Sequence, residues 1–450
     1  MQMQSMEWPR LLSHKRLKGK IQPVDPARSP FQQDFDRIVF STAFRRLQDK
    51  TQVFPLADND FVHTRLTHSL ETSCVGRSLG TAVGHALLER GRELAGLPAS
   101  DIGAIVAAAC LAHDIGNPPF GHSGEDAIRH WFLTSPIIEK MPTLYKDHWL
   151  TSPQRRDIEE YEGNAQGFRL LTRLQMATDR GGLRLTCATI GAFTKYPFPS
   201  PALKTAPWAK KIGYFESEAD LFAEVADETG LLRQNNGWSR HPLVFLVEAA
   251  DDICYRIIDF EDGFRLGCVS YETVCDLFQK VIGKNDPVSP DKTSEEKKNH
   301  LEVLRAQAIN ATVDQVRDAF LKNEEAILAG TFNQPLIECR SAGSSDALQE
   351  IRTISFKQVY GARRVIEIET AGFEVLGGLL DIFAQAVLTT KPTTRDDKVQ
   401  ELILDQLPKT HGPHLPYQQL LRILDFVSGM TDSYAVGLYK KLKGISLPGQ

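Results

Sequence analysis

Apolar residues recur at mixed spacings of three and four along most of the chain, which is the repeat of an α-helix with one buried face. This repeat predicts helices over 70–93, 102–111, 244–260, 306–328 and 372–388. The alternation of apolar and polar residues that marks a half-buried strand is scarce, and its best example, RVIEIE at 364–369, is short. The pattern therefore predicts an all-α fold with at most a small β-hairpin.

Three stretches interrupt the helical pattern. Residues 134–157 are rich in proline and charge, and residues 196–211 contain four prolines, which are excluded from a helix interior. Residues 284–300 are polar and punctuated by proline, which is typical of a connection between two parts of a chain. We therefore predict a catalytic helical core over 29–283, with loop insertions at the first two stretches, and a C-terminal helical region over 301–450.

The composition is that of a globular protein. The 450 residues are 42% hydrophobic and 24% charged, which excludes wholesale disorder. Apolar runs such as 105–112 are far shorter than the roughly 20 residues of a membrane span, and the N-terminus lacks the apolar segment of a secretory signal. The seven cysteines form no CxxC pair, so we expect neither a disulfide framework nor a thiolate zinc site, and we expect a cytoplasmic protein.

The net charge of −5 argues against a nucleic-acid-binding protein as a whole, although a local basic patch stays possible.

The sharpest chemical signal is the pair His113-Asp114 in CLAHDIGNPPFGH, where an apolar helix is expected to end at Gly116. A histidine and a carboxylate at a buried helix end are costly unless they are paired or coordinated. The pair taken alone also fits a capping histidine beside a solvated aspartate.

Further metal-capable residues lie elsewhere in the front half. His68 begins an amphipathic helix, and Glu248, Asp251 and Asp252 interrupt the apolar run VFLVEAADDICYRII. Adjacent carboxylates in an apolar helix repel each other and lose hydration, which a cation would relieve. Two imidazoles and two carboxylates would suit Mn²⁺, Fe²⁺, Co²⁺ or Mg²⁺ with positions left open for water and phosphate oxygen. They would come from His68, His113, Asp114 and Asp251.

Six ordered strings extend this pattern: RRLQDKTQVFPL, HTRLTHSLE, HDIGNPPFGHSGE, EGNAQGFR, EAADDICY and DFVSGMTDSYA. From about Ser29 to the C-terminal region, the chain resembles the deoxyguanosinetriphosphate triphosphohydrolase (dGTPase) family of HD-domain metal-dependent phosphohydrolases. The resemblance implies an all-helical fold, one divalent metal ion, and hydrolysis of a deoxynucleoside triphosphate (dNTP), dGTP foremost, to deoxynucleoside and inorganic tripolyphosphate.

Carried over position by position, the family's metal ligands fall on His68, His113, Asp114 and Asp251. Asp251 is preferred to Asp252 because it matches the Ala-Asp pair of the motif. Helix geometry agrees, since Asp251, Tyr255 and Asp259 are spaced four apart and form one polar stripe. Asp252 would point off that stripe, and we expect it to pair with Arg256 at i+4.

The family's catalytic dyad falls on His122 and Glu125 in GHSGED. At i and i+3 of a helix start the two side chains are able to touch, so that Glu125 orients the imidazole while His122 handles a proton. A favourable acid at a helix N-terminus would explain Glu125 but not His122. Asn117 stands where some relatives of the superfamily carry another histidine.

The resemblance also implies that the substrate is bound by Arg46, Gln52, Val53, Arg65, Asn164, Lys195, Tyr196, Tyr255 and Asp259. A triphosphate carries about four negative charges and needs cationic and amide donors, which Lys195 and the arginines supply. Asn164 and Tyr255 match positions near the triphosphate and sugar, and Tyr255 would exclude a ribose 2′-OH. The amide of Gln52 offers a donor and an acceptor to a purine edge. For Arg46 a plain structural role stays equally open.

We therefore expect attack of water on the α-phosphorus of a dNTP, assisted by His122 as base or acid. Assembly into a homo-oligomer, such as a hexamer, through the C-terminal helices is implied by the resemblance alone. Another HD nucleotidase or phosphodiesterase is an alternative, which would not need the KTQVF and EGNAQG strings. A second alternative is a single-stranded DNA-binding protein with a vestigial HD site, in which Arg45, Arg46 and Lys50 line a basic groove.

Overall fold

The computed structural model describes residues 5–21, 25, 27–52, 63–176, 181–202, 209–287, 292–339, 342–361, 363–388, 394–404 and 415–445. Within these ranges the helices are α1 (Trp8–Leu11), α2 (Pro30–Val39), α3 (Thr42–Arg46), α4 (Arg65–Glu89), α5 (Ala99–Ala112), α6 (Gly121–Thr134), α7 (Pro136–Tyr145), α8 (Ser152–Glu159), α9 (Gly163–Arg169), α10 (Cys187–Phe193), α11 (Ala219–Thr229), α12 (Val244–Arg265), α13 (Tyr271–Ile282), α14 (Ser294–Lys322), α15 (Glu324–Leu328), α16 (Ala342–Ile354), α17 (Arg363–Leu388), α18 (Thr394–Leu404), α19 (Pro416–Ser428) and α20 (Asp432–Leu442). A π-helical turn, η7 (Ser355–Val359), follows α16.

The predicted all-α class is confirmed. The described residues contain one antiparallel sheet, formed by β1 (Arg233–Gln234) and β2 (Gly237–Trp238), so the small hairpin is present. The five predicted helices are found with extended or shifted ends. The stretch 306–328, for example, is divided between the end of α14 and α15.

The predicted strand over 364–369 is wrong, because these residues lie in α17. The six-residue alternation is part of a longer helical repeat. Val365 is buried, Ile368 packs on the smaller core, and Val375 and Leu379 of that core follow farther along the helix. The three-residue spacing of Val365 and Ile368 places both on one helix face, and packing of that face against α6 outweighs the local β-propensity.

The predicted loop insertion over 134–157 is also largely helical, since it contains α7 and the first part of α8. Pro136 and Pro153 occupy the first turns of these helices, where the missing N–H has no helical partner to bond. In the connection predicted at 284–300, α14 begins at Ser294 behind a capping box formed by Thr293 and Glu296. Proline therefore marks helix starts here as often as loops.

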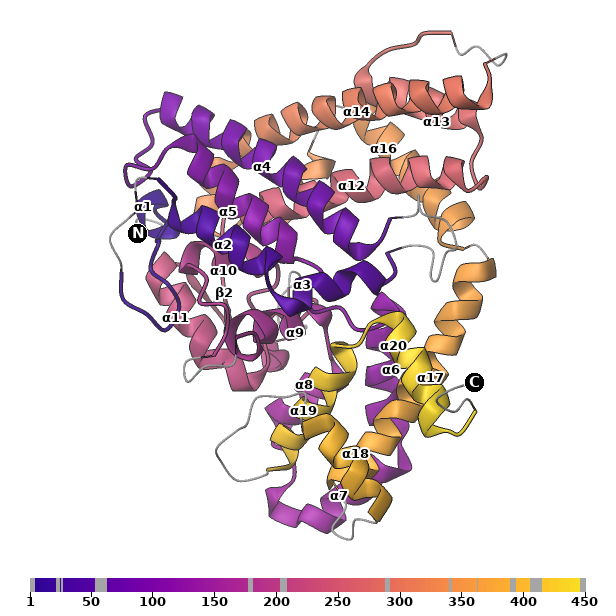
Figure 1. The fold of residues 1–450 in the computed structure, drawn as a ribbon. Helices are drawn as coiled ribbons and strands as arrows, with labels where there is room; N and C mark the ends of the chain where they lie inside the picture. Colours follow the sequence, from indigo (N-terminus) through magenta and orange to yellow (C-terminus); the bar gives the residue numbers. More distant parts are fainter. Residues whose placement is uncertain are drawn as a thin grey trace.

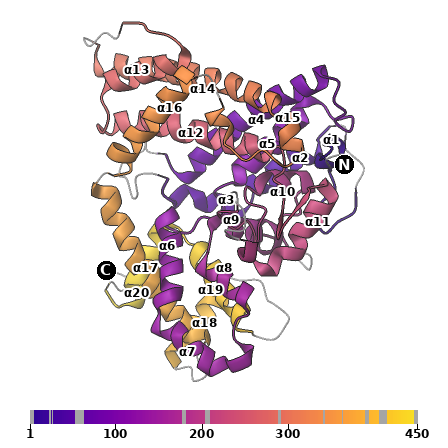
Figure 2. The same ribbon diagram turned by 180° about the vertical axis from the view of Figure 1, so that it is seen from behind.

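Two hydrophobic cores organise the helices (Figure 1). The larger core is built from α1 to α5 and α9 to α16, and the smaller from α6 to α8 and α17 to α20. Figure 2 shows from behind that α6, from the front half of the sequence, lies beside the C-terminal α17. Each core therefore draws on both of the predicted sequence regions, 29–283 and 301–450.

Close packing of α4 on α5 positions the chemical motifs. At Gly80 an added Cβ would lie 2.9 Å from the Cα of Gly103, so the two backbones approach as only glycine permits. This contact aligns the two helices, so that the N-terminal turn of α4, with His68, lies beside the C-terminal end of α5.

One described helix segment, Val365–Leu388 of α17, is long and apolar enough to cross a membrane by length and composition. Half of its most apolar window is buried inside the protein, against the smaller core, as is common for the core helix of a folded domain. The apolar character of α17 is thus accounted for by its contacts with other helices.

Candidate active site

The start of α4, the end of α5 and the middle of α12 meet at one point of the larger core. Thr64 caps α4 by accepting a hydrogen bond from the N–H of Thr67, and His68 follows within the first turn. His113 and Asp114 come directly after the last residue of α5. Asp251 projects from the middle of α12. The motifs that lie far apart in the sequence therefore converge because α4, α5 and α12 pack together.

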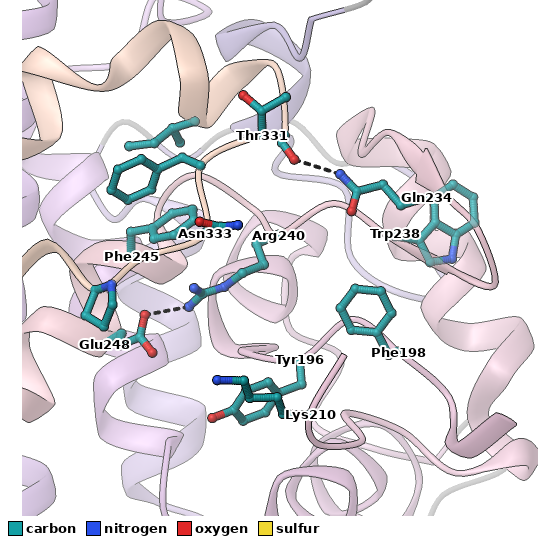
Figure 3. Close-up of a pocket in the computed structure, with 14 residues that line it drawn as sticks. Tyr196, Phe198, Lys210, Gln234, Trp238, Arg240, Phe245, Glu248, Thr331 and Asn333 are labelled. Atoms are coloured by element: carbon teal, nitrogen blue, oxygen red, sulfur yellow. Dashed lines mark hydrogen bonds and ion pairs between the residues drawn. The ribbon is translucent and has the colours of Figure 1, made fainter. Parts of the chain in front are cut away.

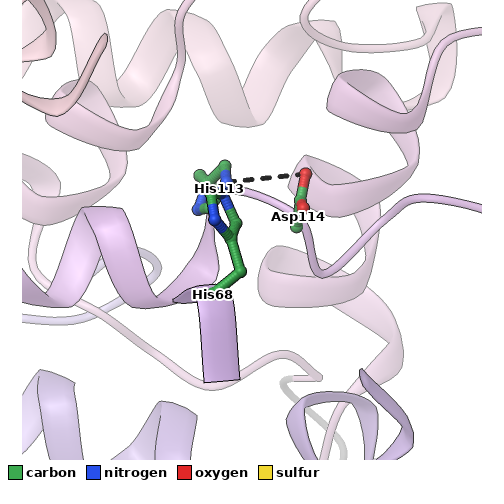
Figure 4. A group of neighbouring side chains, drawn as sticks. All are labelled: His68, His113 and Asp114. Atoms are coloured by element: carbon green, nitrogen blue, oxygen red, sulfur yellow. Dashed lines mark ion pairs between the residues drawn. The ribbon is translucent and has the colours of Figure 1, made fainter. Parts of the chain in front are cut away.

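The side chains of His68, His113 and Asp114 face one another (Figure 4), and one ligand atom of each lies within 4.8 Å of the others. The two imidazole rings meet edge to face, with centroids 5.2 Å apart. Asp251 completes the group, because its Oδ1 lies 3.1 Å from Nε2 of His68 and 3.5 Å from Nε2 of His113. Four donors thus surround one small volume.

Surrounding contacts orient these donors. Nδ1 of His113 lies 2.6 Å from the carbonyl oxygen of Cys110, to which it donates, so that Nε2 presents its lone pair to the cluster. Asp114 accepts hydrogen bonds from Nη1 of Arg65 at 2.5 Å and from Nδ2 of Asn117 at 2.6 Å. Asn117, which stands where some relatives of the superfamily carry a histidine, therefore orients the Asp114 carboxylate.

Electrostatics keep the two carboxylates ionised. Burial raises the pKa of Asp114, but the opposing charges of Arg65, His113 and His68 outweigh it and hold that pKa well below its ordinary value. For Asp251 burial is likewise outweighed, by His113 first and then His68, and the pKa falls to about 2. Two imidazole nitrogens and two ionised carboxylates are a donor set that fits one divalent cation.

The neighbouring Asp252 behaves differently. Burial raises its pKa to about 6, and its side chain makes no contact with the two histidines among the described residues. The expected ion pair with Arg256 is not formed at contact distance, and Nε of Arg256 has no described hydrogen-bond partner. Asp252 and Arg256 both line the cavity beside Asp251 and Tyr255, and the expectation that Asp252 points off the polar stripe stays a prediction.

A cavity of about 570 Å³ opens in front of the cluster. Four of the predicted substrate residues line it, namely Gln52, Arg65, Lys195 and Tyr255. It also receives Arg352 from α16 and Tyr360 from the turn after η7, neither of which the sequence patterns singled out. These two residues are more than 90 positions beyond the last front-half motif, and no local signal marks them.

Tyr360 joins the far wall of the cavity to α12. Its ring stacks on Tyr255, with centroids 5.2 Å apart and planes 5° from parallel. Its hydroxyl donates a hydrogen bond of 2.7 Å to Oδ2 of Asp259, whose pKa is raised to about 7 by burial. Asp259 therefore contacts Tyr360, which lines the cavity, but Asp259 is not itself among the lining residues. Its direct contact with a substrate stays a prediction.

His122 and Glu125 lie at the start of α6, on the opposite side of the cavity opening. His122 is 78% exposed, and its Nδ1 lies 3.5 Å from Oε2 of Glu125. Glu125 is buried, and its other oxygen accepts a hydrogen bond of 2.6 Å from the N–H of Gly163. A Cβ at Gly163 would come 2.9 Å from that oxygen and 2.3 Å from Oδ1 of Asn117, so only glycine fits there.

Desolvation at the cavity wall, with the charges of Lys211 and Arg65, lowers the pKa of His122. Burial raises the pKa of Glu125, although Lys211 and the Gly163 N–H oppose the shift. A neutral imidazole beside a buried carboxyl group is thus favoured near neutral pH. Such a pair is suited to accepting a proton.

Arg46 and Asn164 are not among the residues that line this cavity. Arg46 donates to the carbonyl oxygen of Gly429 at 3.0 Å, which is a contact to the C-terminal helices. Asn164 is half-buried in α9, next to the glycine that binds Glu125. Val53 falls outside the described residues. Roles in substrate binding for these residues stay predictions.

Tyr196 lines a second, smaller cavity of about 190 Å³, together with Phe198, Gln234 and Arg240 (Figure 3). Arg240 binds Oε2 of Glu248 through Nη2 at 2.8 Å. The other oxygen of Glu248 lies 3.2 Å from Nζ of Lys195, which belongs to the larger cavity. Glu248 therefore lines both cavities and binds one cation from each.

Comparison with known families matches two parts of this structure. Residues 65–150, which carry His68, His113 and the dyad, match the HD domain. Residues 339–441, which carry Arg352 and Tyr360, match the Phosphohydrolase-associated domain. Both matched regions therefore contribute side chains to the same cavity.

Curated relatives match nearly the full chain. A Deoxyguanosinetriphosphate triphosphohydrolase-like protein of Synechocystis sp. is 46% identical over 98% of this chain and 100% of its own length. A protein of the same description from Pseudomonas aeruginosa is 39% identical over 98% and 100%. A Deoxyguanosinetriphosphate triphosphohydrolase of Salmonella paratyphi A is 33% identical over 92% of this chain and 94% of its own length.

Proposed function

Because the chain belongs to the deoxyguanosinetriphosphate triphosphohydrolase family of HD-domain metal-dependent phosphohydrolases, we propose that it hydrolyses dNTPs, with dGTP foremost, to deoxynucleoside and inorganic tripolyphosphate. One observation carries the proposal. The four-donor cluster opens into a cavity that also contains the cations Arg65, Lys195 and Arg352. Cluster and cations together suit a polyphosphate substrate held against a metal ion.

In this proposal His68, His113, Asp114 and Asp251 hold one divalent ion, with Mn²⁺, Mg²⁺, Co²⁺ and Fe²⁺ as the candidates. Such an ion supplies charge neutralisation and Lewis-acid polarisation at a phosphoryl oxygen. The support is the convergence of the donors and the low pKa values of both carboxylates.

Arg65, Lys195 and Arg352 bind the triphosphate. Arg65 already shares Asp114 with the cluster, and this contact would place bound phosphate next to the metal ligands. Lys195 is held by Glu248, which keeps its ammonium at the edge of the cavity. Arginine and lysine donors of this kind form charge-assisted hydrogen bonds with phosphate, which are about twice as strong as neutral ones.

His122 moves the proton of the reaction. A water oxygen forms a bond to the α-phosphorus, and the bond from that phosphorus to the 5′-oxygen of the nucleoside breaks. Neutral His122 accepts the proton of the attacking water, and Glu125 orients the imidazole through the Nδ1 side. The 5′-oxygen takes up a proton as the deoxynucleoside leaves, and tripolyphosphate is released.

The stacked pair Tyr255 and Tyr360 forms the wall beside the sugar, where a 2′-OH would meet an aromatic face. Gln52 reads the base with its amide, whose Oε1 has no described partner and is free to accept. We further propose that the enzyme acts in the cytoplasm as a homo-oligomer. Single-stranded DNA binding is the second function to test. Of the three basic residues expected to line its groove, Arg45 and Arg46 are exposed, whereas Lys50 is buried and bonded to two carbonyl groups.

The decisive experiment incubates metal-loaded protein with each dNTP and each NTP, and identifies the products by chromatography. We expect deoxyguanosine and tripolyphosphate from dGTP, no turnover after chelation, and little turnover of the NTPs. Release of phosphate or of a monophosphate would instead assign another HD phosphohydrolase activity. A protein that binds single-stranded DNA with a steep salt dependence, and turns over no dNTP, would overturn the proposal.

A further inference from the structure

The loop 114–120 joins the metal cluster to the dyad, and a lysine from outside the HD motif holds its centre. Nζ of Lys50 donates to the carbonyl oxygen of Asn117 at 2.6 Å and to that of Ser428 at 2.7 Å. Lys50 is only 3% exposed. A single ammonium group therefore joins the active-site loop to the C-terminal end of α19.

A buried aspartate holds the far end of the same loop. Asp432, the first residue of α20, is 1% exposed. Its Oδ1 accepts a hydrogen bond of 3.0 Å from the N–H of Phe120, and its Oδ2 accepts bonds from the N–H and hydroxyl of Thr51 at 3.0 and 2.5 Å. The carboxylate also lies at a helix N-terminus, where negative charge is favoured.

Each of the two loop residues that these side chains bind, Asn117 and Phe120, is directly connected to a residue of the proposed active site. Asn117, whose carbonyl binds Lys50, donates its side-chain amide to Asp114 at 2.6 Å. Phe120, whose N–H binds Asp432, adopts a left-handed backbone with φ 63° and is followed by α6, which carries His122. A non-glycine residue holds that conformation only where its surroundings fix it. Asp432 supplies such a contact.

We propose that Lys50 and Asp432 are positioning residues that set the distance and angle between the metal cluster and the His122–Glu125 dyad. We call this pair the loop clamp. It rests on the proposed function for its effect on catalysis, whereas its effect on loop order and metal affinity does not depend on the substrate. The C-terminal helices α19 and α20 thereby become part of the active-site framework.

The charge environment supports the clamp. Burial lowers the pKa of Lys50 to about 7, and the opposing charge of Asp432 is the largest influence that resists this shift. The Lys50 side chain therefore lies in a buried position that disfavours its charged form, and there it binds two carbonyl groups. A purely space-filling residue would not need that arrangement.

The test compares Lys50→Met and Asp432→Asn with the parent. Lys440→Met is the matched control, because Lys440 is an exposed lysine on α20 with no described hydrogen bond. Circular dichroism reports folding, calorimetric titration of the metal-free protein with Mn²⁺ reports metal affinity, and steady-state kinetics with dGTP separates kcat from KM. Hydrogen–deuterium exchange follows the amides of residues 114–121.

Both clamp variants should weaken Mn²⁺ binding by about 10-fold, as expected for the loss of outer contacts to a metal site. They should lower kcat by about 10- to 100-fold with KM nearly unchanged, and exchange at 114–121 should become faster. The double variant should be little worse than either single variant, since the two residues act on one loop. The control should match the parent in all four measurements.

Folded variants with parental Mn²⁺ affinity, kcat and exchange would overturn the proposal, as would a change in KM alone. Asp432→Asn preserves shape and keeps the test decisive where Lys50→Met fails to fold. Should the parent hydrolyse no dNTP, the proposed function fails by itself. The exchange and metal-affinity measurements then still decide whether the clamp orders the loop.

Discussion

Replacing His122 by alanine separates a catalytic role from a structural one, because the structure gives this histidine almost no part in folding. Its side chain is 78% exposed, and its one described polar partner, Glu125, is 3.5 Å away. Truncation therefore opens no buried cavity and leaves no strong hydrogen bond unsatisfied. Exposed substitutions of this kind change stability by about 0.5 kcal/mol or less, which is a Tm shift of roughly 2 °C or less.

The expected effect on the reaction is much larger. A general acid or base contributes about 10²- to 10⁴-fold in rate. At about 1.4 kcal/mol per tenfold, His122→Ala should raise the activation barrier by roughly 3 to 5 kcal/mol. Metal content and dGTP affinity should stay near the parental values, because His122 is not among the clustered metal donors.

Glu125 provides the contrast. Its carboxylate is 2% exposed and accepts the N–H of Gly163 at 2.6 Å. Glu125→Ala leaves that buried N–H without its acceptor and should cost about 1 to 3 kcal/mol of stability in addition to activity. Glu125→Gln keeps an acceptor and should lose less rate than His122→Ala. The double variant His122→Ala with Glu125→Gln should be little slower than His122→Ala, since groups acting as a unit are not additive.

The assay measures kcat for dGTP, metal content, dGTP affinity and Tm on the same preparations. We expect kcat to collapse at constant Tm for His122→Ala, and both kcat and Tm to fall for Glu125→Ala. An alanine variant at position 122 that turns over dGTP at close to the parental rate would refute the dyad. The proton would then have to be handled by another group.

Other parts of the structure lead to further predictions. Asp114→Ala should lose bound metal and activity together, as measured by metal analysis of the purified variant. Asp251→Asn should also lose metal whereas Asp252→Asn retains it, and the reverse result would transfer the ligand role to Asp252. Asp157, whose pKa burial raises to about 7, keeps its proton in the folded state but loses it near pH 4 when unfolded, so stability should fall as pH rises from about 4 through 7. Urea unfolding at pH 5 and pH 7.5 tests this, because Asp157→Asn should flatten the difference. Arg240→Met removes one of the two cations that bind half-buried Glu248. Glu248 should then hold Lys195 more tightly and away from the phosphates, so KM for dGTP should rise roughly five-fold, or about 1 kcal/mol.

The sequence determined the features that depend on local periodicity and local motifs. Apolar spacings of three and four predicted the helices that build the larger core, because burial of one helix face follows directly from that repeat. The His113-Asp114 pair could be placed at a helix end because Gly116 and two prolines follow it. The strings around His68 and Asp251 indicated the family, and nearly full-length similarity to its members confirmed that resemblance.

Local patterns misled where tertiary packing outweighed them. The alternating run at 364–369 resembles a strand only over six residues, and the burial of Val365 together with the packing of α17 on α6 makes it part of a helix. In 134–157, Pro136 and Pro153 occupy first turns, whereas Pro142 lies inside α7, whose Ile138 and Met141 are buried in the smaller core. In both cases the deciding contacts are with residues distant in the sequence, which a local window does not contain.

Only the tertiary structure decided which distant residues share the cavity. Arg352 and Tyr360 belong to it because α16 and η7 pack along α12, and no spacing rule links them to Tyr255. Tyr196 lines the second cavity although it adjoins Lys195, whose Nζ lies 5.6 Å from the centre of its ring. Asp432 reaches Phe120 across 312 residues of sequence. A sequence determines how each segment buries its own apolar face, whereas the polar partners of a site depend on how those faces pack together.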